Sequence, residues 1–167
     1  MASATEPPTV ESMTAPTAPR AQIPRLQPLA NRLVRGLLRT PVISKGIGKR
    51  LVTIRVVGRK SGRRFDVPVA YTREGDHLLV GTPFGWGRNL RTGEPVDIWL
   101  EGKLRRADVE AFSDEPHVVE LYTTMCQDNH HFAQFNKIGF DGDGNLNAND
   151  LHEAWAAGAR AFRLTPH

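Results

Sequence analysis

The fold of this chain is decided by residues 51–82, which read Leu51-Val-Thr-Ile-Arg-Val-Val57, Gly58-Arg-Lys-Ser-Gly-Arg-Arg64, Phe65-Asp-Val-Pro-Val-Ala-Tyr-Thr72, Arg73-Glu-Gly-Asp76 and His77-Leu-Leu-Val-Gly-Thr82. The first, third and fifth segments are rich in β-branched and apolar residues, and Gly-containing turns separate them, which predicts three short strands. Pro68 has no backbone N–H, so we expect an edge or a bulge in the second strand.

The rest of the chain continues this pattern. Val96 to Leu100 and Leu104 to Phe112 are joined by Glu101-Gly-Lys103 and predict a hairpin. Regularly spaced short strands with tight turns favour a small antiparallel barrel over a parallel sheet, that is, an α+β or mainly β fold.

Two helices are expected in the C-terminal part. The first begins at Asp114, before Pro116, and runs through Phe135 within a helical segment of about 114–137. The second spans Asp150 to Ala157, with Asn147 or Asn149 as its cap and Gly158 as its stop. A last strand is expected from Ala159 to Leu164, so that a terminal helix and strand occupy about 149–165.

The N-terminal part differs in composition from the rest. Residues 1–24 are rich in Pro, Ala and Thr and predict a flexible tail, and residues 25–167 form the single domain. Residues 25–40 predict a basic amphipathic helix in which Leu recurs at helical spacing and Arg fills other positions. This helix either packs one face on the domain or contacts an anionic membrane surface through residues 25–39.

Charge is distributed unevenly along the 167 residues. Between Ser12 and Phe65 there are thirteen Lys and Arg residues and no Asp or Glu, although the net charge of the whole chain is only +4. This asymmetry points to an anionic partner. Nucleic acid is not expected, because no aromatic residue stands among these charges between Ser12 and Arg64 to stack on bases.

The compartment is expected to be the cytoplasm. Cys126 is the single cysteine, so no internal disulfide requires an oxidising environment. The first 20 residues lack the pattern of a secretory signal, and no stretch approaches the apolar length of a spanning helix. We therefore predict a soluble protein or one associated with the membrane surface.

Several familiar chemistries lack a motif here. Asp141-Gly-Asp143-Gly-Asn145 begins like a calcium loop, but the expected Gly and the bidentate Glu are missing, so a polar loop with Asx turns is the better account. His130 and His131 are adjacent and point in different directions, so no metal site is predicted. There is no Gly-x-Ser-x-Gly, no Walker loop and no complete dinucleotide fingerprint.

The turn Gly58-Arg-Lys-Ser-Gly62 carries the strongest chemical signal. Arg and Lys supply charged donors, Ser supplies a hydroxyl, and the glycines allow a close backbone approach, which suits a phosphate or a carboxylate. The same residues would also form an ordinary solvated turn.

A resemblance decides between these interpretations. The turn, the helix sequence Asn31-Arg-Leu-Val-Arg-Gly-Leu-Leu-Arg-Thr-Pro41 and the later Trp86-Gly-Arg-Asn-Leu90 together resemble the deazaflavin-dependent nitroreductase family, over residues 25–112 and more loosely beyond. The resemblance implies a split β-barrel with flanking helices that binds coenzyme F420.

The resemblance also implies roles for individual residues. The cofactor's anionic tail would lie on Gly58, Arg59, Lys60, Ser61 and Gly62. Its ring system would lie beside Trp86 and Asn89 and against the backbone of Gly81, Thr82 and Pro83. Tyr122 is the first choice as proton donor, ahead of His130 and His131, and solvent could also serve.

The implied activity is hydride transfer from reduced F420 to a small hydrophobic, nitro- or quinone-like acceptor. FMN is the second candidate cofactor, because it shares an anionic tail and a flat tricycle. Two hypotheses without this chemistry are a non-catalytic barrel that binds flavin, haem or lipid, and a basic module that contacts a membrane or nucleic acid. Whether two copies pair as a homodimer through exposed barrel edges is left open.

Overall fold

The computed structural model describes residues 50–167. The predicted tail of residues 1–24 and the predicted basic helix of residues 25–40, with its membrane contact, lie outside the described residues. Within residues 50–167 no helix is both long enough and apolar enough to cross a membrane.

The described part of the chain is built around one antiparallel sheet of seven strands, in the order β2-β1-β5-β6-β7-β4-β3. The strands are β1 (Leu51–Val57), β2 (Arg64–Ala70), β3 (Thr72–Glu74), β4 (His77–Thr82), β5 (Val96–Leu100), β6 (Lys103–Phe112) and β7 (Arg160–Pro166). All neighbours pair antiparallel, as the short strands and tight turns predict.

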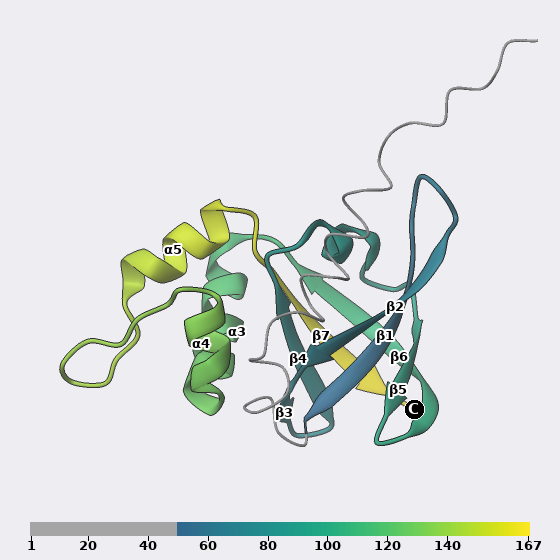
Figure 1. The fold of residues 1–167 in the computed structure, drawn as a ribbon, viewed down its shortest axis with the longest axis horizontal. Helices are drawn as coiled ribbons and strands as arrows, with labels where there is room; N and C mark the ends of the chain where they lie inside the picture. The colour runs from purple at the N-terminus through teal and green to yellow at the C-terminus, as the bar shows by residue number, and fades with distance from the viewer. Residues whose placement is uncertain (1–49) are drawn as a thin grey trace, which may run out of the picture. The chain divides into compact units, whose positions relative to one another are not determined.

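The sheet curls into a split barrel. Its two edge strands, β2 and β3, follow one another in the sequence and are separated only by Tyr71. The two edges must therefore approach each other at this residue, although they are not hydrogen-bonded neighbours. The predicted small antiparallel split β-barrel with flanking helices is confirmed (Figure 1).

Alternation along the strands fills the interior of the barrel. Val52, Ile54 and Val56 of β1 are fully buried, and Thr53 and Arg55 between them point to the other face. The inner residues of other strands are buried in the same way: Leu78, Val80, Ile98, Leu100, Val109, Phe162 and Leu164. Burial of these side chains is the main stabilising contribution to the barrel.

One predicted strand is in fact two. The segment from Phe65 to Thr72 divides at Tyr71 into β2, which pairs with β1, and β3, which pairs with β4. Pro68 lies opposite Thr53 in a continuous register, so it marks an edge strand and not a bulge. The missing N–H costs nothing at such an edge, which is why Pro is tolerated here.

The helix predicted through Phe135 is also two elements. They are α3 (Glu115–Asp128) and α4 (His130–Phe135), separated by Asn129. The Asn129 side chain accepts hydrogen bonds from the backbone N–H groups of His131 and Phe132, at 3.0 and 3.3 Å, so it caps a new helix. Helix α5 (Ala148–Ala156) begins earlier than predicted, and Asn147 is its cap.

These three helices lie on one side of the barrel, beside β3, β4 and β7 (Figure 1). Eleven buried residues form the contact layer between the helices and the outer face of β4 and β7: Leu79, Val118, Leu121, Tyr122, Met125, Cys126, Ala133, Ile138, Leu151, Ala159 and Ala161. The barrel therefore has one inner core and one outer core.

Candidate functional site

The turn between β1 and β2 is closed by backbone hydrogen bonds. The Gly58 N–H donates to Arg63 O at 2.8 Å, and the Gly62 N–H donates to Gly58 O at 2.7 Å. Gly62 has a φ of +64°, and a Cβ on Gly58 would lie 2.8 Å from Ser61 Oγ. The left-handed φ favours glycine at position 62 whatever the turn binds, whereas rotation of the Ser61 side chain would relieve the contact at Gly58.

A short 3-10 helix, η1 (Gly85–Asn89), holds this turn from the side. The Arg59 N–H donates to Asn89 Oδ1 at 3.1 Å, and Arg59 Nη1 donates to Arg88 O at 3.2 Å. Asn89 Nδ2 donates to Trp86 O at 2.9 Å. The Asn89 side chain thus holds η1 with its Nδ2 end and reaches the β1–β2 turn, 30 residues away in the sequence, with its Oδ1 end.

Between the turn and η1 lies an open groove with a cavity volume of about 720 Å³. Its lining comes from three short segments: Gly58, Arg59, Lys60 and Ser61; Gly85, Arg88 and Asn89; Arg91 and Glu94. Four cationic side chains and one carboxylate face the same space. Glu94 pairs with Arg91 at 3.5 Å, and among residues 50–167 no carboxylate pairs with Arg59, Lys60 or Arg88.

The groove therefore presents a local excess of positive charge. Like charges this close are destabilising unless an anion or solvent screens them. The side chains remain exposed, so a bound anion would be partly hydrated and each contact would be of modest strength. Arg59, Lys60 and Ser61 were predicted from the sequence to bind an anion, whereas no role was predicted for Arg88, Arg91 and Glu94.

The residues predicted for the ring system lie elsewhere. Trp86 is 7 % exposed, and its ring stacks on Phe162 of the barrel interior, with centroids 6.4 Å apart. Thr82 is 2 % exposed, and its Oγ1 accepts from the Phe84 N–H at 3.1 Å. Among the predicted ring contacts, only Asn89 lines the groove, and Gly81, Thr82, Pro83 and Trp86 do not.

Gly81 and Gly87 are needed for close packing. A Cβ on Gly81 would lie 2.6 Å from Phe132 Cζ and 2.9 Å from Tyr122 Cε2. A Cβ on Gly87 would lie 2.7 Å from Thr82 Cγ2. Helices α3 and α4 therefore press directly against β4 at Gly81.

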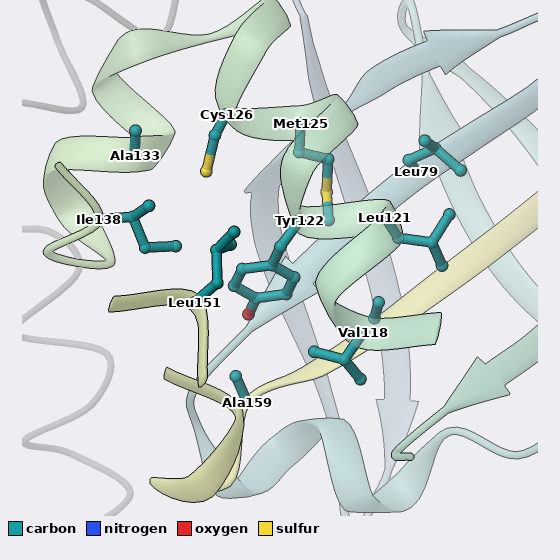
Figure 2. Close-up of a cluster of buried hydrophobic side chains, with 11 residues drawn as sticks. Leu79, Val118, Leu121, Tyr122, Met125, Cys126, Ala133, Ile138, Leu151 and Ala159 are labelled. Carbon is teal, nitrogen blue, oxygen red and sulfur yellow. The ribbon is translucent and has the colours of Figure 1, made fainter. Parts of the chain in front are cut away.

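Tyr122 lies inside the outer core. Its ring is 1 % exposed and meets Phe132 edge-on at a centroid distance of 5.2 Å, and Figure 2 shows it in the middle of the buried cluster. Its hydroxyl is buried and has no hydrogen-bond partner in the described part of the chain. Burial raises the pKa of Tyr122 above its ordinary value, the neighbouring Cys126 adds to this, and the backbone of Thr82 opposes it. The group stays protonated at neutral pH.

The loop between α4 and α5 has the Asx-turn geometry that its sequence predicts. Asp141 Oδ1 accepts from the N–H groups of Asp143 and Asn145 at 3.0 and 2.7 Å. Hydrogen bonds from these groups lower the pKa of Asp141. Residues 50–167 contain no cluster of three or more His, Cys, Asp or Glu residues that could hold a metal ion.

No family model and no curated protein matches this chain. Three solved structures are similar in shape. A chain described as a domain-swapped dimer has a TM-score of 0.45 and 12% identity, over 83% of this chain and 97% of that one. A conserved hypothetical protein from Mycobacterium tuberculosis has a TM-score of 0.43 and 11% identity, over 72% and 75%. A pyridoxamine 5'-phosphate oxidase-related, FMN binding protein from Nostoc punctiforme has a TM-score of 0.43 and 11% identity, over 87% and 82%.

These likenesses are distant and carry no argument about function. The class of the protein rests instead on its own sheet and groove. It is a split β-barrel with three helices on one side and an open cationic groove between the β1–β2 turn and η1.

Proposed function

We propose that this protein is an oxidoreductase that holds coenzyme F420 by its anionic tail and reduces a small hydrophobic, nitro- or quinone-like acceptor. The observation that carries the proposal is the cationic groove, in which Arg59, Lys60 and Arg88 have no carboxylate partner among the described residues. Phosphate and carboxylate groups are the ligands that such a set of donors recognises.

The residues of the turn fit the tail. The Arg59 guanidinium uses Nη1 on Arg88 O, which leaves its other N–H groups available for an anion and fixes the direction of the side chain. Lys60 adds an ammonium group and Ser61 a hydroxyl at the same rim. We assign the tail to Arg59, Lys60 and Ser61, with Gly58 and Gly62 shaping the turn.

The fit of the ring system is less direct. Trp86 is packed on Phe162, so it would support a ring from below rather than stack on its open face. The backbone of Gly81, Thr82 and Pro83 and the Asn89 amide remain the proposed polar contacts. When bound, the reduced cofactor supplies a hydride, and the protein's part is to orient the two reactants and exclude water.

An aromatic pair at the start of η1 favours an apolar acceptor. Phe84, the residue before Gly85 of the groove lining, meets Phe135 of α4 edge-on, with centroids 6.0 Å apart. Phe135 is 49 % exposed, which is unusual for a large apolar side chain. These rings could cover a flat hydrophobic molecule next to the cofactor.

Tyr122 is the proposed proton donor. Its raised pKa keeps the proton on the hydroxyl but also makes it a weak acid, so it would act only where a strongly basic product forms. If Tyr122 has this role, Tyr122→Phe lowers kcat with little change in KM. If kcat is unchanged, solvent, His130 or His131 supplies the proton.

Titration of the purified protein with F420 and with FMN, followed by ring fluorescence, tests the proposal. Arg59→Ala or Lys60→Ala should weaken F420 binding about tenfold each, since one exposed charge-assisted contact contributes about 1.4 kcal/mol. Arg63→Ala is the matched control, because Arg63 belongs to the same turn but does not line the groove.

Three outcomes would count against the proposal or change it. Tighter binding of FMN than of F420, with the same response to the variants, would replace the cofactor and keep the groove. Binding of F420 that is indifferent to Arg59→Ala and Lys60→Ala would remove the tail from this groove. Binding of neither cofactor would leave the non-catalytic barrel or the basic module as the better account.

A further inference from the structure

The cationic groove contains one acidic residue. Of the residues between 50 and 167 that line it, Arg59, Lys60, Arg88 and Arg91 carry a positive charge, and only Glu94 carries a negative one. Glu94 Oε1 lies 3.5 Å from Arg91 Nη1. This ion pair neutralises one end of the groove, whereas the cations at the β1–β2 turn keep their charge.

The segment that carries the ion pair is anchored on β6. The Gly93 N–H donates to Val109 O at 3.1 Å, and Thr92 Oγ1 accepts from the Ala111 N–H at 2.9 Å. These two hydrogen bonds to one strand fix the backbone directly before Glu94. The fold therefore holds this carboxylate at the groove, and a ligand that occupies the groove has to meet it.

The two ends of the groove differ in their chemistry. At the turn, Arg59 and Lys60 have no carboxylate partner within residues 50–167, and their charged donors attract an anionic group. At the other end, Arg91 is already neutralised, and the Glu94 carboxylate repels a second anionic group. An ionised carboxylate only accepts hydrogen bonds, so Glu94 is suited to an O–H or N–H group of a ligand.

The size of the groove brings both ends into use. Its volume of about 720 Å³ is within the range of pockets that hold a whole small molecule, and a single phosphate group would fill a minor part of it. The atoms that follow the anionic group in a ligand therefore lie in the same groove. They reach the Arg91–Glu94 end before they reach solvent.

We propose that Glu94 is a specificity residue that limits the groove to one anionic group followed by a neutral chain with hydrogen-bond donors, such as hydroxyl groups. This inference rests on the proposed anion groove but not on the identity of the cofactor. In a cofactor with a longer tail, the anionic group next to the turn is held, and any further anionic group stays in solvent.

Glu94 can be replaced without disturbing the fold. The Arg91 and Glu94 side chains are 47 % and 63 % exposed, and an ion pair with this exposure contributes little to stability. Glu94→Gln keeps the shape of the side chain and removes its charge, which frees Arg91 for a ligand. The melting temperature should therefore stay the same, and a change in ligand preference would come from the groove itself.

A matched pair of ligands tests the proposal. Glycerol phosphate and phosphoglycerate share one carbon chain and one phosphate, and they differ in that a terminal hydroxymethyl group is replaced by a carboxylate. Both are titrated into the full chain at low ionic strength, where exposed charges are least screened. The dissociation constants are measured from the NMR shifts of the amide groups in the turn Gly58–Gly62.

The wild type should bind glycerol phosphate at least as tightly as phosphoglycerate, although phosphoglycerate carries more negative charge. Glu94→Gln should shift the ratio of the two dissociation constants by about fivefold to tenfold in favour of phosphoglycerate, because one repulsion is lost and one cation is freed. Adding Arg91→Ala to Glu94→Gln should remove most of this gain, since Arg91 is the cation that the second anionic group would contact.

Glu120→Gln is the control for a general effect of charge. Glu120 is exposed on α3 and does not line the groove, and its replacement changes the net charge by the same amount. The ratio of the two dissociation constants should be the same in this variant as in the wild type. An equal shift in Glu94→Gln and Glu120→Gln would overturn the proposal.

Three other results would also overturn it: a wild type that clearly prefers phosphoglycerate, a ratio that Glu94→Gln leaves unchanged, and binding of neither ligand to either protein. A gain that is fully retained without Arg91 would refute the role given to that end of the groove. The proposed F420 function fails separately. If F420 does not bind but the ratio shifts as expected, the role of Glu94 stands without that cofactor. If F420 binds through Arg59 but the ratio does not shift, the cofactor stands without that role.

Discussion

Replacing Tyr122 by Phe should make this protein more stable. The hydroxyl is buried in the layer between α3 and β4 and has no hydrogen-bond partner in the described structure. In the unfolded chain the same hydroxyl is hydrated. Folding therefore removes a polar group from water without compensation, and Tyr122→Phe removes that cost while keeping the ring that packs on Phe132.

The size of the gain follows from two opposing contributions. An unsatisfied buried hydroxyl costs about 1–3 kcal/mol. Removing its oxygen leaves a space smaller than a methyl group, and the lost contacts cost less than about 1 kcal/mol. The net stabilisation is about 1 kcal/mol, which corresponds to a rise of roughly 3–5 °C in the melting temperature of a domain of this size.

Thermal and urea unfolding of the two proteins at pH 7 measure this difference. Tyr71→Phe, at the chain's other tyrosine, is the control, because its hydroxyl is not among the buried atoms that lack a partner. We expect no gain from the control. A fall in the melting temperature of Tyr122→Phe would show that the hydroxyl has a hydrogen-bond partner in solution, and this would refute the reasoning. The backbone of Thr82, which lowers the pKa of Tyr122, is the candidate partner.

Three further predictions concern packing, the α3 terminus and pH. Gly81→Ala should lower the free energy of unfolding by about 1–3 kcal/mol, because its Cβ would lie 2.6 Å from Phe132 Cζ. Gly85→Ala is the control, since a Cβ there meets nothing within 4 Å, and it should leave the melting temperature unchanged in the same thermal unfolding experiment. Asp128→Ala removes the acceptor for Arg50 Nη1 at 2.6 Å and for Thr72 Oγ1 at 2.9 Å. The melting temperature should therefore fall by an amount that corresponds to about 1–2 kcal/mol. An unchanged melting temperature would mean that these two contacts do not stabilise the fold. Hydrogen bonds, first of all from the Asn145 backbone, lower the folded-state pKa of Asp141. Its contribution to stability is therefore present above pH ~4, the ordinary range of an Asp, and is lost as the pH falls through the lowered pKa. The difference in melting temperature between the wild type and Asp141→Ala should shrink as the pH is lowered below about 4, and a constant difference would contradict this.

Most of the barrel could be predicted from local patterns. Alternation in Leu51–Val57, the turn residues of Gly58–Gly62 and the hairpin around Gly102 depend on neighbours in the sequence, and each appears in the structure where the pattern placed it. The predicted element boundaries were wrong at two places, where a single residue ends one strand or helix and another begins directly after it. Tyr71 divides one apparent strand between the two edges of the sheet, and Asn129 divides one apparent helix by capping a second.

The candidate site could be predicted only in part. The chemistry of Arg59, Lys60 and Ser61 is visible in the sequence because charge and turn residues are adjacent. That Arg88 and Arg91 face the same groove is not visible, since it depends on how η1 docks on the turn through Asn89. The sequence could not show that Trp86 packs inward on Phe162, because an indole is equally suited to a core and to a ligand.

The sequence by itself thus determined most of the strands and turns and an excess of positive charge near residue 60, because these features depend on residues a few positions apart. Only the tertiary structure decided which strands become the two edges and which cations share one groove. Those facts depend on strand register and on contacts between residues tens of positions apart, which are fixed only when the apolar faces of the whole sheet are buried together.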